Sequence, residues 1–182
     1  MALGSLHDLY VEELRDLYNA ENQLLKALPR MAKAASDESL SAAFEEHLEV
    51  TRGQVDRLDR IFKELGEKAT GKKCVAMEGL IGEAKELLEE DAEPAVLDAA
   101  LIAAAQRVEH YEMAGYGCVR TYAWLLGYEK AADLLQETLD EEGEADHKLT
   151  ELAESVINIE AEEEPTEPVR NGRGRKRAVA RR

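Results

Sequence analysis

Two glutamates, Glu109 and Glu112, lie one helical turn apart inside an otherwise apolar stretch of the chain. Small or apolar residues around them recur at spacings of three and four, which is the pattern of a buried helical face: Leu101, Ala105, Val108, Gly115, Val119 and Leu126. Removing an ion from water costs several kcal/mol, whereas a whole domain is stable by only about 5–15 kcal/mol. The rest of the fold must therefore compensate two inward carboxylates.

The composition favours an all-α protein. Only 5% of the residues are aromatic, β-branched residues are sparse, and no segment alternates apolar and polar residues as a strand would. Periodicity and capping residues predict helices over residues 5–35, 38–65, 75–90, 94–126 and 130–157. Pro29 should kink or divide the first of these, because proline removes a backbone donor and clashes with the preceding turn.

The connections between these helices predict the topology. Short turns join the first helix to the second and the last two helices to each other, whereas a long crossover containing the short helix 75–90 links the two hairpins. This connectivity is typical of a ferritin-like four-helix bundle. We therefore expect one bundle domain over residues 1–159.

Each long helix carries polar residues on its apolar row. Glu21 lies between Leu17 and Leu25, and His47 lies on the inward row of the second helix, with Gln54 as a further candidate. The last helix places Glu142 and Asp146 on the row that it is expected to bury through Leu135, Leu139, Leu149, Leu152 and Val156. The candidate metal ligands are therefore Glu21, His47, Glu109, Glu112, Glu142 and Asp146.

No lysine or arginine occupies these rows, so the charge must be balanced by protonation or by bound cations. A site rich in oxygen, with little nitrogen and no sulfur, suits Fe, Mn or Mg better than Zn or Cu. His47 has a second interpretation of equal weight, that of a core histidine bonded to a backbone carbonyl.

Four segments of the chain resemble the YciE/YciF-type ferritin-like proteins: residues 18–24 (YNAENQL), 47–54 (HLEVTRGQ), 74–80 (CVAMEGL) and 108–112 (VEHYE). The resemblance covers residues 5 to 159 and implies a rubrerythrin-like bundle that forms a homodimer and takes part in bacterial stress responses. The pair Glu109 and Glu112 also resembles the third-helix glutamates of rubrerythrin.

Two helices depart from the pattern of di-iron bundles, in which the second and fourth helices of the bundle each carry an inward Glu-x-x-His motif. The second helix instead has Thr51-x-x-Gln54. The last helix does contain Glu144-x-x-His147, but both residues fall on outward rows. We therefore predict that Glu144 and His147 face solvent and bind no metal.

Two functions follow as hypotheses. The first is a stress-response protein with a carboxylate-rich di-metal site, holding two Fe or Mn ions per chain, that acts on O2 or peroxide or handles the metal itself. The alternative is a non-catalytic stress or interaction bundle that has lost the redox centre. Metal content would separate the two, and the pattern alone does not establish whether the protein is an enzyme.

Charge divides the chain into a body and a tail. The formal net charge is −16, but residues 169–182 hold seven basic residues and no acidic ones, so residues 1–168 alone carry −23. We expect residues 160–182 to form a disordered tail, acidic and then basic, that folds back onto the acidic body or binds nucleic acid non-specifically. The body should avoid polyanions.

The chain is expected to work in the cytoplasm. Cys74 and Cys118 have no CxxC or ligand spacing, which favours a reducing compartment, and the first residues lack the apolar region of a signal peptide. No apolar run is long enough to span a bilayer, so no membrane partner is expected.

Overall fold

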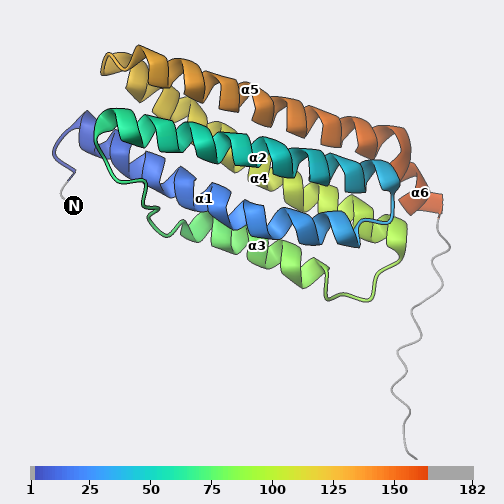
Figure 1. Ribbon diagram of the computed structural model, residues 1–182. Coiled ribbons are helices and arrows are strands. Elements are labelled where there is room, and N and C mark those ends of the chain that lie inside the picture. Colours follow the sequence, from blue (N-terminus) through green and yellow to red (C-terminus); the bar gives the residue numbers. More distant parts are fainter. Residues whose placement is uncertain (1–2, 164–182) are drawn as a thin grey trace, which may run out of the picture.

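The computed structural model describes residues 3–163, and every regular element in that range is helical (Figure 1). The elements are α1 (Leu6–Ala34), α2 (Glu38–Leu65), α3 (Val75–Leu87), α4 (Pro94–Leu125), α5 (Glu129–Leu152), the π-helical turn η1 (Ala153–Ile157) and α6 (Asn158–Glu163). The predicted all-α fold class is therefore confirmed. No helix in the described range is both long enough and apolar enough to cross a membrane.

Capping side chains explain where the long helices begin and end. Ser5 accepts the N–H of Asp8 at the start of α1, and Asp37 accepts the N–H of Leu40 at the start of α2. Gly66 ends α2 with φ 70°, a conformation that glycine adopts without steric cost. These local signals account for the close agreement between predicted and observed helix ends.

Pro29 does not divide α1, so that part of the prediction is wrong. The helix runs on to Ala34, and its last turns bury Met31 and Ala32 in the core. Packing of this apolar face stabilises the terminal turns even though proline supplies no N–H to the helix.

The helices form the predicted four-helix bundle with a crossover helix. α1 pairs with α2 and α4 with α5, while α3 packs along α1 and α4 (Figure 1). The crossover before α3 is fastened to α1, because the N–H of Lys72 donates to the carbonyl of Arg15 and the N–H of Cys74 donates to Asn19 Oδ1. Gly71 is required there, since an added Cβ would lie 2.7 Å from Asn19 Cβ.

A buried carboxylate fastens the turn between α1 and α2 to α4. Asp98 is 2% exposed and accepts the backbone N–H groups of Ser36 and Asp37 as well as the Ser36 hydroxyl. All the donors come from one turn, so this carboxylate is satisfied without a cation.

The hydrophobic core is divided into two clusters along the bundle. One lies near the α1–α2 turn and includes Leu28, Phe44, Leu101 and Leu149. The other lies near the α4–α5 turn and includes Leu14, Ile61, Val119 and Leu135. Leu17 and Ala20 of α1 belong to different clusters, so the division falls beside Glu21.

The end of α5 differs from the prediction in phase. Val156, expected to be buried, is exposed, and Ile157 is buried instead. The π-helical turn η1 has more residues per turn than an α-helix, so it rotates the buried face by one residue.

Helix α6 continues to Glu163, past the expected end of the domain at residue 159, because Asn158 to Glu163 prolong the helical path of η1. The rest of the predicted tail, residues 164–182, lies outside the described residues.

Candidate metal centre

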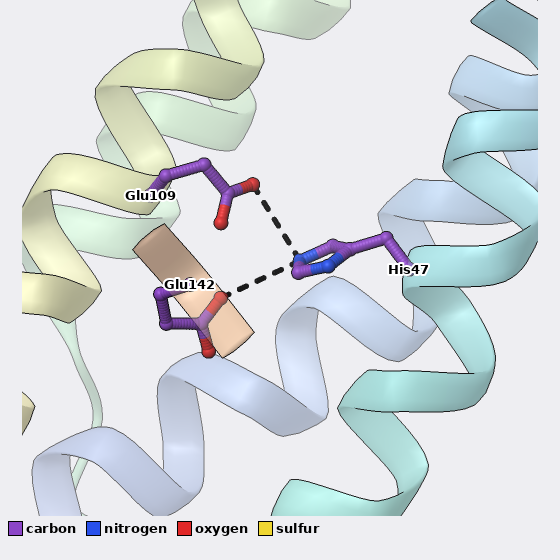
Figure 2. A group of neighbouring side chains, drawn as sticks. All are labelled: His47, Glu109 and Glu142. Carbon is purple, nitrogen blue, oxygen red and sulfur yellow. Dashed lines mark ion pairs between the residues drawn. The ribbon is translucent and has the colours of Figure 1, made fainter. Parts of the chain in front are cut away.

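Three side chains from three helices meet between the two core clusters (Figure 2). His47 Nε2 lies 3.5 Å from Glu109 Oε1 and 3.8 Å from Glu142 Oε2. One ligand atom from each residue lies within 4.8 Å of the other two, which is close enough for a single cation to contact all three. α2 supplies the imidazole, and α4 and α5 supply the carboxylates.

Two further buried carboxyls extend this group. Glu21 of α1 accepts a hydrogen bond from the Tyr116 hydroxyl through Oε1, whereas its Oε2 has no hydrogen-bond partner within residues 3–163. In the same part of the chain, Glu112 of α4 has no hydrogen-bond partner on either oxygen. Together we call these five residues the polar layer: Glu21, His47, Glu109, Glu112 and Glu142.

Burial shifts the protonation of the polar layer toward neutral forms. Burial lowers the pKa of His47 to about 4, so the imidazole is neutral at pH 7 and offers a lone pair. Burial likewise raises the pKa of Glu109 to about 8, although the neighbouring Glu142 carboxyl opposes the rise. The pKa values of Glu21, Glu112 and Glu142 are raised well above the usual range, by burial first and by the charge of other carboxyls in the polar layer second.

Most oxygens of the polar layer have no hydrogen-bond donor among the described residues. Seven of its side-chain atoms are buried with no hydrogen-bond partner within the described residues: Glu21 Oε2, His47 Nε2, Glu109 Oε2, both oxygens of Glu112 and both oxygens of Glu142. Buried polar atoms in proteins are normally hydrogen-bonded, and each orphan costs about 1–3 kcal/mol. This many acceptor atoms in one place is the pattern of a cation site.

The positive charge of Arg57 acts on Glu21 of the polar layer, but its guanidinium is hydrogen-bonded to a different carboxylate. Its Nη1 donates to Glu141 Oε2 at 2.6 Å, and its Nε lies 3.3 Å from Glu137. Gln54 also donates to Glu141, at 3.2 Å. Glu141 is thus half-buried and hydrogen-bonded, because the long Arg57 side chain reaches across from α2.

The sixth predicted ligand, Asp146, lies apart from the three-residue group. It is half-buried, accepts from Gln106 Nε2 at 3.2 Å, and lies 3.3 Å from Nε2 of the exposed His110. One turn beyond Glu142, its side chain points along the edge between α4 and α5. Its charge still contributes to the raised pKa of Glu109.

The Glu144-x-x-His147 motif of α5 faces solvent, as predicted. Glu144 and His147 are both exposed, and His147 pairs with Glu151 at 3.3 Å. On α2, the Thr51 hydroxyl donates to the His47 carbonyl at 2.9 Å. The second helix therefore presents a hydroxyl and the amide of Gln54 where di-iron bundles carry a glutamate and a histidine.

Tyr116 contacts the polar layer and was not among the predicted site residues. It is fully buried, and its hydroxyl donates to Glu21. Its position four residues after Glu112, on the same face of α4, was the available signal.

The donor set fits a transition metal of the iron or manganese kind. One neutral imidazole with several carboxylates suits these metals, and no thiolate is present in the group. His47, Glu109 and Glu142 would hold one ion, and Glu21 and Glu112 offer further oxygens beside it.

Comparison with known proteins gives consistent results. A family model described as a domain of unknown function, DUF892, matches residues 5–162. Protein YciF of Escherichia coli (strain K12) is 52% identical over 163 residues, which cover 89% of this chain and 98% of that protein. The crystal structure of the E. coli stress protein YciF superposes with a TM-score of 0.82, covering 85% of this chain and 98% of that one. YcfI from Rhodopseudomonas palustris is 45% identical, with a TM-score of 0.79 and coverage of 81% and 94%.

Proposed function

The chain belongs to the DUF892 family, and on the chemistry of its polar layer we propose that it binds iron or manganese inside the bundle. The observation that carries this proposal is the set of seven buried oxygen and nitrogen atoms, contributed by four helices, that have no hydrogen-bond partner among the described residues. A structural role for the same carboxyls would leave these atoms unsatisfied, as Asp98 illustrates by contrast, since its oxygens are fully hydrogen-bonded to one turn.

Each residue of the polar layer would have a distinct role in holding the metal. His47, neutral at pH 7, supplies nitrogen, and Glu109 and Glu142 supply the oxygens that face it. Glu21, oriented by the Tyr116 hydroxyl, and Glu112 complete a set that suits two ions per chain. Binding must displace the protons of the buried carboxyls, so affinity should rise with pH.

A bound pair of such ions would supply redox chemistry toward O2 or peroxide, or a store of the metal itself. The fold contributes burial, which excludes bulk water, and fixed helical positions for the ligands. By analogy with the E. coli stress protein YciF, we place this activity in a stress response. A cytoplasmic location, a homodimer and non-specific nucleic-acid binding through the tail stay predictions.

A second candidate function is a bundle without redox activity, and one observation favours it. α2 carries Thr51 and Gln54 in place of the glutamate and histidine of di-iron bundles, so the layer has fewer charged ligands. In that case the carboxyls would remain protonated and the protein would bind no metal.

Metal analysis distinguishes these functions. The full chain, purified and then incubated with Mn²⁺ or with Fe²⁺ under anaerobic conditions, should retain close to two ions per chain. The Glu109→Gln, Glu142→Gln double variant should retain less than half of that amount, and the matched Glu144→Gln, His147→Ala variant should retain all of it. Wild-type protein that holds no metal, and whose thermal stability is unchanged by metal or chelator, would rule out the proposal.

A further inference from the structure

A pocket opens between α2 and α5 and ends at the polar layer. Its volume is about 150 Å³, enough for several water molecules. His47 and Glu109 lie on its lining, and both are more than nine-tenths buried. His47 Nε2 and Glu109 Oε2 have no hydrogen-bond partner among the described residues, so the pocket leads to open ligand positions.

Apolar side chains from both helices form part of the pocket wall. Ala43 and Val50 line it from α2, and Ala145 and Leu149 line it from α5. These four side chains have no polar atom that could bind a passing ion or water molecule. A small side chain at position 145 also means that a larger one would fill the passage.

Charged residues surround the outer part of the pocket. Glu46, Glu141 and Glu144 contribute carboxylates, and Lys148 contributes an ammonium group. Lys148 of α5 pairs with Glu46 of α2, so this ion pair spans the gap between the two helices. Both side chains are largely exposed, at 46% and 67%, and pairs of this kind are weak and open readily.

We propose that this pocket is the route by which divalent cations reach the polar layer, and that Lys148 slows their entry by its charge and by its bond to Glu46. This inference rests on the proposed metal binding. Three carboxylates around one ammonium group attract cations and disfavour anions. The partner of the route is therefore a divalent metal ion.

The test measures the rates of Mn²⁺ association and dissociation with the full-length protein. Val50→Phe and Ala145→Phe fill the passage from opposite walls, and Ala103→Phe, at an exposed position of α4 outside the pocket, is the matched control. An obstructed route slows entry and exit alike, because both use it. We expect both rates to fall by about tenfold or more in the filled variants, with the equilibrium affinity changed by less than about threefold.

Lys148→Gln tests the charge. We expect association to accelerate roughly two- to fivefold at low ionic strength, with the difference shrinking in about 0.5 M salt. Lys85→Gln, which removes a lysine of α3 that pairs with Glu89, should leave the rate unchanged.

The outcomes separate the two proposals. Wild-type protein that binds Mn²⁺ with rates unaffected in both Val50→Phe and Ala145→Phe would refute the route and leave the metal site standing. Wild-type protein that binds no metal would refute both. An unchanged rate in Lys148→Gln, with slowed rates in the filled variants, would remove Lys148 from the mechanism and overturn that half of the proposal.

Discussion

Replacement of Glu142 by methionine should stabilise the metal-free protein and abolish the extra stability that bound metal gives. Glu142 is fully buried, and neither of its oxygens has a hydrogen-bond partner in the part of the chain that the structure describes. Methionine is unbranched and adapts to irregular core space, so it can fill the same volume without a polar group. In metal-free protein, loss of an unsatisfied buried carboxyl should stabilise the fold by about 1–3 kcal/mol.

The expected size of the effect follows from linkage. A domain of this length gains about 2–4 °C in Tm per kcal/mol, so metal-free Glu142→Met should melt roughly 2–12 °C above wild type. Metal at about 100 times its Kd should stabilise wild type by about 2.7 kcal/mol, or roughly 5–11 °C. Glu142→Met should lose that gain.

Thermal melts followed by far-UV circular dichroism, with chelator and with excess Mn²⁺, measure both effects. Glu144→Met is the matched control, because Glu144 is an exposed glutamate on the same helix. It should shift the metal-free stability by no more than about 0.5 kcal/mol and keep the response to metal. A metal-free Glu142→Met protein less stable than wild type, together with a wild type indifferent to Mn²⁺, would refute the reasoning.

Four further results are expected. In urea unfolding, metal-free protein should lose stability as the pH rises from 6.5 to 8, because Glu109 has a pKa of about 8 when folded and near 4.5 when unfolded, so the folded chain keeps a proton that the unfolded chain releases. The lowered pKa of His47 has the opposite effect, but only as the pH falls from 6.5 toward 4. A flat stability profile above pH 6.5 would therefore contradict the burial of the Glu109 carboxyl. Asp98→Ala should cost about 2–4 kcal/mol in the same assay, since it leaves the N–H groups of Ser36 and Asp37 unpaired, and a loss below about 0.5 kcal/mol would show that water replaces it. Gly71→Ala should cost about 1–3 kcal/mol, because the new methyl group would press on Asn19, and wild-type stability in that variant would show that the crossover adjusts freely. His147→Ala should leave metal content intact, since that residue is exposed and pairs with Glu151; lost metal would place His147 in the site.

The fold and most of the polar layer were predictable because helical spacing determines which face a residue occupies. Glu21, Glu112 and Glu142 each interrupt an apolar row, and all three are fully buried. Short turns and one long crossover then restrict how the faces can meet. Capping residues such as Ser5 and Asp37 placed the helix starts.

Features that depend on more than one helix were not predictable in this way. Asp146 shares the row of Glu142, but its distance along the helix puts it beside Gln106 and His110. Glu141 is half-buried because the Arg57 side chain extends to it from α2. The hydrogen bond from Tyr116 to Glu21 joins residues 95 apart in the chain, a distance at which no local pattern operates.

The π-helical turn at the end of α5 was missed for a different reason. Helical spacing with a constant number of residues per turn predicts that Val156 is buried, whereas in the structure Ile157 is buried in its place. The continuity of α1 through Pro29 was not predicted, because the helix propensity of proline reflects the lost hydrogen bond and does not include the tertiary packing of Met31 and Ala32.

The separation of the hydrophobic core into two clusters also determines the alignment of the helices during folding. Apolar side chains alone would tolerate a helix displaced along its neighbours by one turn, about 5.4 Å, because one leucine can replace another. With the polar layer between the clusters, the same displacement would carry Glu21 of α1, or Glu142 of α5, into apolar surroundings. The alignment in which all four long helices bring their polar residues to one level avoids that cost, so the residues proposed to hold the metal also select the native register of the bundle.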